Sequence, residues 1–126
     1  MFVYGTLRRG EVRDINALKP APTFVMQGTV LGTLFNLGKY PGLVLGQGSP
    51  VLGEVYAIAD ELETVLDAIE GIGPNPRDEY AKRTVEVLSA KERYACLVYE
   101  VNPSCLPGKE RIHHGDWVRY RLQALE

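Results

Sequence analysis

The first residues of the chain contain a segment that could bind an anion. In Tyr4-Gly5-Thr6-Leu7, a strand-like run ends at a glycine, which allows the backbone to turn sharply. Successive N–H groups after such a turn can converge into an anion-binding nest, and the hydroxyl of Thr6 adds a further donor. The alternative is an ordinary strand-to-loop turn followed by the solvated pair Arg8-Arg9, since such turns are common. Both interpretations stay open.

A second candidate is the carboxylate of Glu70, in the last turn of a predicted helix and directly before Gly71. The C-terminal end of a helix carries partial negative charge, so a partly buried carboxylate there should have a raised pKa. Such a glutamate is a better proton acceptor, which makes Glu70 a candidate general base. The alternative is a solvated glutamate at a frayed helix end, like Glu61 or Glu63 on the exposed face.

Tyrosines are the third feature, with seven in the chain. Tyrosine pairs an apolar ring with a hydroxyl and so suits the wall of a polar cavity, for which Tyr40, Tyr80 and Tyr99 are candidates. Because strands favour tyrosine, most of the seven are better explained as ordinary strand residues. Arg83 follows Tyr80 at a spacing that places it on the opposite face of a strand, so the two need not share a function.

Other kinds of site have little support in the sequence. His113-His114 lacks the spacing of a metal site, and no Ser-His-Asp arrangement, nucleophile elbow or glycine-rich phosphate loop is found. Cys96 lies in an apolar run and is interpreted as a buried thiol. The net charge of −2 opposes nucleic-acid binding, for which the cluster of Arg8, Arg9 and Arg13 is the only support.

Length and composition fit one globular domain over residues 1–126. A chain with 45% hydrophobic and 24% charged residues can bury a core without disulfides or a structural metal. No apolar run approaches the roughly 18 residues of a membrane-spanning helix. The strand-like pattern that begins at Met1 leaves no room for a signal peptide. We therefore expect a cytoplasmic protein with no nucleic-acid or membrane partner and leave its oligomeric state open.

Short strands separated by glycines and prolines dominate the predicted secondary structure. The predicted strands are 2–4, 24–30, 31–37, 43–45, 51–58, 80–88 and 93–101, and loops are predicted at 73–78 and 102–108. Gly28 and Gly32 are predicted to form bends or bulges. So many strands do not suit a parallel βαβ sheet. The expected fold is α+β, a small and mostly antiparallel barrel with one or two flanking helices.

One segment has the pattern of an amphipathic helix. Apolar residues recur at helical spacing in a single stripe formed by Leu62, Val65, Leu66 and Ile69. Asp60 is the predicted N-cap, Glu63 completes a capping box, and Gly71 is the predicted C′ residue. A shorter helix is predicted at 14–18.

Six short motifs occur in order along essentially the whole chain. They are Phe2-Val3-Tyr4-Gly5-Thr6-Leu7, Tyr40-Pro41-Gly42, Gly53-Glu54-Val55-Tyr56, Leu66-Asp67-Ala68-Ile69-Glu70-Gly71, Glu79-Tyr80-x-x-Arg83 and Gly115-Asp116-Trp117. Together they resemble the γ-glutamylcyclotransferase-like superfamily. The branch most similar in pattern is that of the plant avirulence-induced (AIG2-like) proteins and the γ-glutamylamine cyclotransferases.

The resemblance implies a barrel that encloses a polar cavity and an enzyme that releases 5-oxoproline from a γ-glutamyl amine or amino acid. It implies that Glu70 is the general base and that the N–H groups of Gly5, Thr6 and Leu7 hold the substrate's carboxylate. Tyr4, Tyr40 and Tyr80 complete the substrate-binding residues that it implies. The α-amino group would attack its own γ-carbonyl, with no metal or organic cofactor.

Two alternatives remain beside this interpretation. One is a related acyl-transfer or lyase reaction on another carboxylate-bearing amide. The other is a non-catalytic small-molecule binding or interaction module of the same fold. The segment 72–78 is longer than in the shortest family versions and could reshape the cavity mouth, so the substrate is left open.

Overall fold

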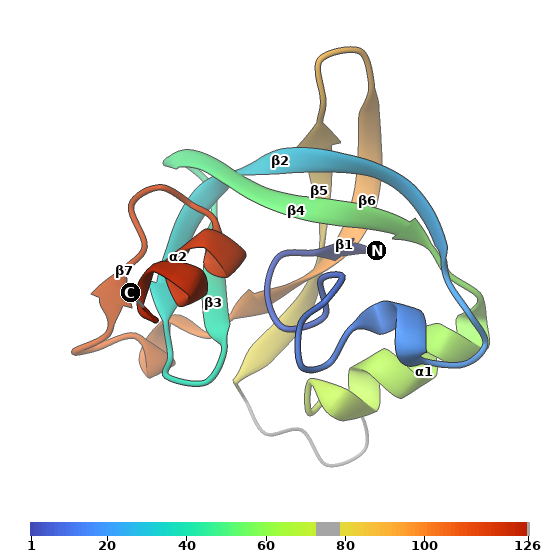
Figure 1. Ribbon diagram of the computed structural model, residues 1–126, viewed down its shortest axis with the longest axis horizontal. Coiled ribbons are helices and arrows are strands. Elements are labelled where there is room, and N and C mark those ends of the chain that lie inside the picture. Colours follow the sequence, from blue (N-terminus) through green and yellow to red (C-terminus); the bar gives the residue numbers. More distant parts are fainter. Residues whose placement is uncertain (73–78, 126) are drawn as a thin grey trace.

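The computed structural model describes residues 1–72 and 79–125 (Figure 1). Its strands are β1 (Phe2–Val3), β2 (Thr23–Asn36), β3 (Pro41–Leu45), β4 (Ser49–Ala57), β5 (Tyr80–Leu88), β6 (Arg93–Val101) and β7 (Glu110–Arg111). Its α-helices are α1 (Asp60–Ile69) and α2 (Trp117–Gln123), and short 3₁₀-helices lie at Ile15–Ala17 and Pro103–Cys105.

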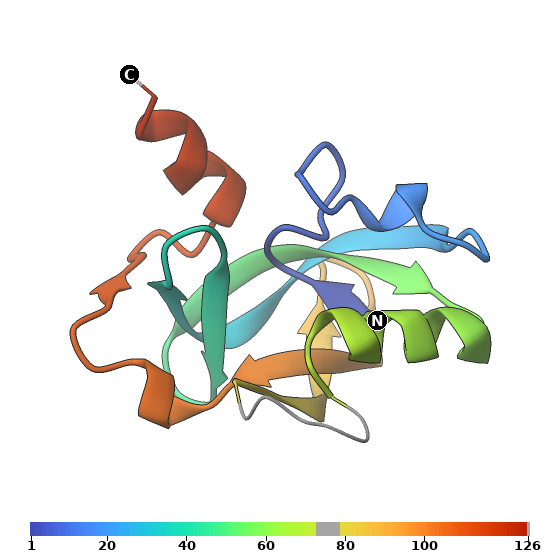
Figure 2. The same ribbon diagram turned by 90° about the horizontal axis from the view of Figure 1, so that it is seen from below.

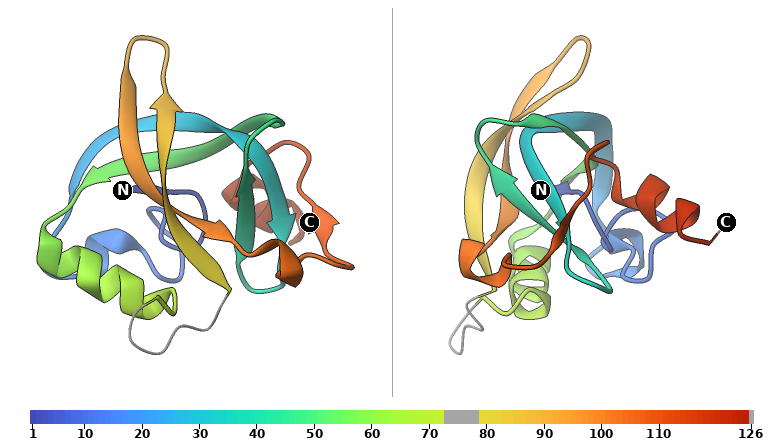
Figure 3. Two further views of the ribbon diagram at one scale, coloured as in Figure 1. Left: turned by 180° about the vertical axis from the view of Figure 1, so that it is seen from behind. Right: turned by 90° about the vertical axis from the view of Figure 1, so that its left-hand side faces the viewer.

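The strands form a nearly closed antiparallel barrel. Hydrogen-bonded neighbours follow the order β1-β4-β2-β5-β6, and both β3 and β7 pair with β2. The long strands β2 and β4 arch over the molecule in Figure 1, and β5 and β6 form a hairpin that extends beyond the barrel in Figure 3. The ends of the strand order meet where the Tyr4 hydroxyl donates to the Tyr99 carbonyl at 2.6 Å. The predicted α+β barrel is confirmed.

Alternation along β1 divides its side chains between two buried clusters. Phe2 belongs to the cluster inside the barrel, whereas Val3 packs in a second cluster against α1. Leu62 and Leu66 of α1 are fully buried in this second cluster, while Val65 of the predicted stripe is partly exposed. The second cluster therefore fixes α1 against the barrel. Figure 2, which views the molecule from below, shows α1 in front of the strands.

Strand β2 is continuous where the sequence predicted two strands with bends at glycines. Its pairing with β4 runs unbroken through Gly28 and Gly32, and the irregularity lies between Phe24 and Met26. The predicted break into two strands is therefore wrong, and no bulge lies at Gly28 or Gly32. Gly28 is instead a point of close approach, because a Cβ there would lie 2.7 Å from Cγ1 of Val87 in β5.

The N-terminal end of α1 differs from the prediction. Its N-cap is Ala59, which makes no side-chain capping bond, and Asp60 is already helical. The predicted N-cap and capping box are therefore wrong. Asp60, Glu61 and Glu63 instead place negative charge in the first turn, where the helix dipole favours it. Glu63 is half-buried and pairs with Lys82 of β5, so it is not on a freely solvated face.

The C-terminal region contains more regular structure than the sequence indicated. Strand β7 and helix α2 were not predicted, and the predicted loop 102–108 includes the 3₁₀-helix Pro103–Cys105. The side chain of Asp116 caps α2 by accepting from the Arg119 N–H at 3.2 Å. Within the segment 14–18, where a short helix was predicted, Ile15–Ala17 forms a 3₁₀-helix. The predicted loop 73–78 lies outside the described residues.

Candidate functional site

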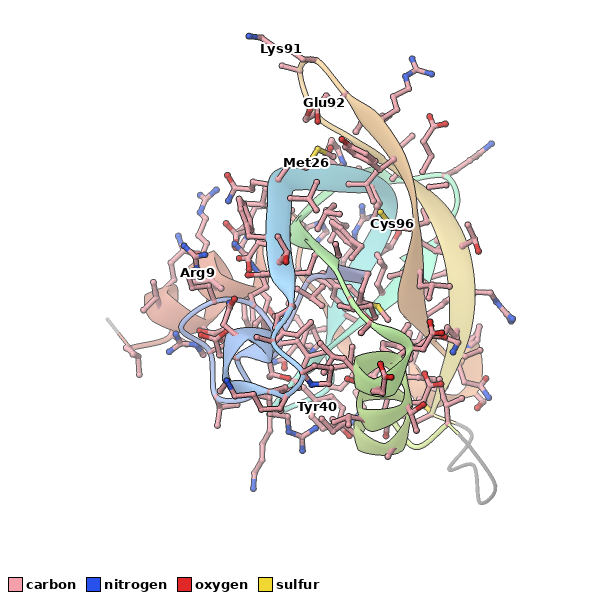
Figure 4. The ribbon with its side chains drawn as sticks, turned by 90° about the vertical axis from the view of Figure 1, so that its right-hand side faces the viewer. Arg9, Met26, Tyr40, Lys91, Glu92 and Cys96 are labelled. Carbon is pink, nitrogen blue, oxygen red and sulfur yellow. The ribbon has the colours of Figure 1, made fainter. Side chains whose placement is uncertain are left out.

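A cavity of about 290 Å³ lies where α1, the segment after β1 and the starts of β3 and β5 come together. Every residue predicted for the site lines it: Tyr4, Gly5, Thr6, Leu7, Tyr40, Glu70 and Tyr80. Figure 4 shows Tyr40 between the N-terminal segment, drawn in blue, and α1, drawn in green. Closure of the barrel thus brings together side chains that are far apart in the sequence.

The segment after β1 folds back on itself through its carbonyl groups. The carbonyls of residues 5–7 accept hydrogen bonds at 2.9–3.0 Å from the N–H groups of Arg8, Arg13 and Ile15, respectively. The N–H groups of residues 5–7 donate to no acceptor within the described part of the chain. Neighbouring N–H groups beside a cavity are suited to binding a carboxylate or a developing oxyanion.

Gly5 is required by close packing, and not by an unusual backbone angle. The backbone of Gly5 does not have the positive φ that other glycines of the chain adopt. A Cβ at Gly5 would lie 2.6 Å from Cγ of Pro41, the first residue of β3. The glycine therefore lets the N-terminal segment approach β3 and narrow the cavity between them.

Glu70 is held at the C-terminal end of α1 by a Schellman motif. It is the C-cap residue, and Gly71 follows with φ of 73°, as predicted for C′. The Gly71 N–H donates to the Ala68 carbonyl at 3.2 Å, and the Ile72 N–H donates to the Asp67 carbonyl at 2.8 Å. These two bonds fix the end of the helix, and with it the backbone of Glu70, which is one of the residues that line the cavity.

Tyr4, Tyr80 and Tyr99 line the cavity in their neutral form. Burial raises the pKa of each phenol above its ordinary value of 10, and the charge of Glu70 raises it further. The Tyr4 hydroxyl donates to the Tyr99 carbonyl at 2.6 Å, and the Tyr80 hydroxyl donates to the Pro41 carbonyl at 2.7 Å. The protons of these two phenols are thus committed to backbone carbonyls. The Tyr4 oxygen also accepts from the Leu43 N–H at 3.3 Å, whereas the Tyr80 oxygen remains as a possible acceptor.

Sequence reasoning did not assign several residues of the wall to the site. Arg13 and Glu79 also line the cavity; the first was considered only as part of an arginine cluster. Tyr99 was named as a candidate cavity tyrosine without a role. Its hydroxyl donates to Asp67 Oδ1 of α1 at 2.7 Å, which ties β6 to the helix that carries Glu70. This contact spans the fold, so no local pattern signals it.

The remaining sequence candidates lie elsewhere. Cys96 is confirmed as a buried thiol inside the barrel, where burial raises its pKa. Arg83 is exposed and pairs with Glu100 at 3.3 Å.

In residues 1–72 and 79–125, no group of three or more His, Cys, Asp or Glu side chains could hold a metal ion. No helix in these residues is long and apolar enough to cross a membrane.

Comparison with known proteins identifies relatives along nearly the whole chain. The profile of the family "Gamma-glutamyl cyclotransferase, AIG2-like" matches residues 1–119. The γ-L-glutamyl-butirosin B γ-glutamyl cyclotransferase of Niallia circulans is 30% identical over 126 residues, covering 98% of this chain and 78% of that protein.

Crystal structures of two similar proteins share the barrel. YkqA of Bacillus subtilis superposes with a TM-score of 0.77 at 27% identity, covering 98% of this chain and 41% of YkqA. An AIG2-like protein of Mus musculus superposes with a TM-score of 0.73 at 24% identity, covering 93% of this chain and 86% of the mouse chain. The mouse likeness supports the fold alone.

Proposed function

Because the chain belongs to the γ-glutamyl cyclotransferase, AIG2-like family, we propose that it releases 5-oxoproline from a γ-glutamyl compound by intramolecular aminolysis. The family predicted from the sequence motifs is confirmed. The observation that carries the proposed reaction is one cavity lined both by Glu70 and by residues 5–7, whose N–H groups donate to no acceptor among residues 1–72 and 79–125.

In the proposed reaction, the α-amino nitrogen of the γ-glutamyl group attacks its own γ-carbonyl carbon. The new C–N bond closes a five-membered ring, and the original γ-amide C–N bond breaks to release an amine. The α-ammonium must lose a proton before it can attack, and we assign Glu70 as the base that accepts it. The leaving amine takes up the two protons that the α-ammonium loses, so the reaction is balanced.

The other residues of the cavity hold the substrate in this proposal. The N–H groups of residues 5–7 bind the α-carboxylate, so that the amino group lies near Glu70. The neutral phenols of Tyr4 and Tyr80 form a wall that adds no competing negative charge. Holding the amine against the carbonyl gains much of the rate advantage available to an intramolecular reaction.

A substrate panel with detection of 5-oxoproline tests the proposal. The panel contains γ-glutamyl amines, γ-glutamyl amino acids and a γ-glutamyl aminoglycoside, since the Niallia relative is named for one. The matched controls are the α-glutamyl isomers, whose α-amine cannot close a five-membered ring on the amide carbon. We expect 5-oxoproline from at least one γ-linked compound and from none of the α-linked isomers.

A different result would support the second candidate function. If γ-glutamyl compounds bind but none yields 5-oxoproline, the protein is a small-molecule binding module of the same fold. The presence of Glu70 in the cavity wall favours the enzyme over this alternative.

A further inference from the structure

A buried ion network lies behind the N–H groups of residues 5–7. Arg8 is only 6% exposed; its Nε donates to Glu54 Oε2 at 3.0 Å and its Nη1 to Asp116 Oδ1 at 2.9 Å. Glu54 lies in β4 and Asp116 caps α2, so one side chain joins the loop to the barrel and to the C-terminal helix. Arg8 is not among the described residues that line the cavity.

The second carboxylate oxygen of Glu54 extends the network along the loop. Oε1 accepts from the Arg9 N–H and from the Tyr56 hydroxyl, each at 2.9 Å. Asn16 Nδ2 donates to the Tyr56 hydroxyl at 3.1 Å. Charge-assisted hydrogen bonds of this kind are short and directional. Glu54 therefore orients both the side chain of Arg8 and the peptide group that follows it.

A network of one arginine and two carboxylates is better explained as a means of fixing the geometry of the loop than as a source of stability for the fold. The cost of removing an arginine and two carboxylates from water offsets most of their attraction, so apolar residues could stabilise the same position as well. What apolar residues cannot do is hold a loop through several directional bonds. Arg8 follows Leu7 directly, and its N–H donates to the Gly5 carbonyl at 3.0 Å. Any movement of Arg8 therefore reorients the peptide groups beside the cavity.

We infer that Arg8, Glu54 and Asp116 are positioning residues that hold the N–H groups of residues 5–7 in the geometry that binds a substrate carboxylate. The inference rests on the proposed function of that loop. It also gives a role to the two sequence motifs at 53–56 and 115–117, which contribute no residue to the cavity wall. The loop that contacts substrate and the network that supports it are thus built from three separate parts of the chain.

Asp116→Asn is the most informative variant. Asparagine is as good an N-cap as aspartate, so the start of α2 is kept while the charge facing Arg8 is removed. We expect affinity for L-glutamate and 5-oxoproline, measured by calorimetry, to fall about tenfold, within the range of couplings in ion networks. KM for a γ-glutamyl substrate should rise by a similar factor, with kcat and melting temperature close to wild type. Glu54→Gln should show the same pattern more strongly, and Asp116→Asn remains decisive if that variant fails to fold.

Arg121→Gln is the matched control. Arg121 of α2 forms an ion pair with Glu11 of the same loop, Nη2 to Oε2 at 2.6 Å, and neither residue lines the cavity. We expect this variant to melt at a lower temperature but to keep wild-type affinity for both probes. The inference is overturned if Asp116→Asn and Glu54→Gln bind both probes like the wild type. It is also overturned if Arg121→Gln weakens binding equally, or if the wild type binds neither probe.

The same measurements separate the two proposals. A wild-type protein that binds L-glutamate but forms no 5-oxoproline from the panel contradicts the proposed reaction. In that case the affinities of the variants still test the positioning role, because they do not depend on turnover.

Discussion

At the residue scale, Glu70→Gln separates proton transfer from packing. Glutamine keeps the size of the side chain but cannot accept the ammonium proton. We expect kcat to fall about 10²- to 10⁴-fold, the usual contribution of a positioned base. The melting temperature should stay level or rise slightly, because a negative charge is removed from the C-terminal end of α1. Steady-state kinetics with the best substrate of the panel and a thermal melt provide the two measurements.

The control for this variant is Glu61→Gln, on the exposed first turn of the same helix. It is a cleaner control than Glu63, whose carboxylate pairs with Lys82. We expect no change in kcat for Glu61→Gln. Near wild-type turnover in Glu70→Gln would disprove the general-base role.

Tyr80→Phe tests what a cavity tyrosine contributes to binding. Its phenol donates to the Pro41 carbonyl, so it can offer a substrate only its oxygen as an acceptor, which suits an ammonium group. Loss of one such hydrogen bond should raise KM about 2- to 12-fold and leave kcat nearly unchanged. Tyr94→Phe, on the exposed part of β6, should have no effect. An unchanged KM in Tyr80→Phe would make Tyr80 a purely structural residue.

At the scale of elements, the end of α1 decides where Glu70 lies. Gly71→Ala forces a Cβ into a backbone with φ of 73°, which should cost about 1–2 kcal/mol of stability. Because the alanine also strains the two hydrogen bonds of the Schellman motif that fix the position of Glu70, we expect kcat to fall as well. Urea unfolding and single-substrate kinetics measure the two effects.

Gly108→Ala is the matched control for the end of the helix. Gly108 has φ of 79° and no atom within 4 Å of a Cβ, so the alanine meets similar backbone strain without contact to the cavity. We expect a comparable loss of stability and an unchanged kcat. If both variants keep full kcat, the helix end does not control the position of Glu70.

At the scale of the whole molecule, the buried tyrosines predict a loss of stability in alkali. The pKa of Tyr4, Tyr80 and Tyr99 is raised above 10 in the folded protein, mainly by burial. The folded state therefore keeps protons that the unfolded state releases above pH 10. Their contribution to stability is complete below pH 10 and is lost as the pH rises beyond it.

The size of this effect follows from proton linkage. Each tyrosine that stays protonated should lower the free energy of unfolding by about 1.4 kcal/mol per pH unit above its unfolded pKa. Urea unfolding between pH 8 and about 11 measures the slope. Tyr99→Phe should make this slope shallower by the contribution of one tyrosine. A slope that is the same in both proteins would contradict the buried, neutral state of Tyr99.

Local patterns in the sequence were sufficient for several elements. Strands 80–88 and 93–101 were predicted at the bounds found for β5 and β6, because their composition and flanking turns act over short distances. The end of α1 at Gly71 was predictable for the same reason. The family motifs also named Glu70, the segment 4–7, Tyr40 and Tyr80 before the cavity was known, but Arg13 and Tyr99 of the same wall lie in none of these motifs.

Features that depend on contacts between distant segments were decided by the tertiary structure alone. The sequence alone suggests a bend at Gly28, and only the approach of β5 shows that this glycine is a point of close packing. The short β7 has too few residues to carry a pattern. From the sequence, Arg8 is interpreted as a solvated arginine beside a turn, since no neighbouring residue indicates that Glu54 or Asp116 will pair with it. Burial gives it these partners, because a charge removed from water must find opposite charges wherever the folded chain supplies them.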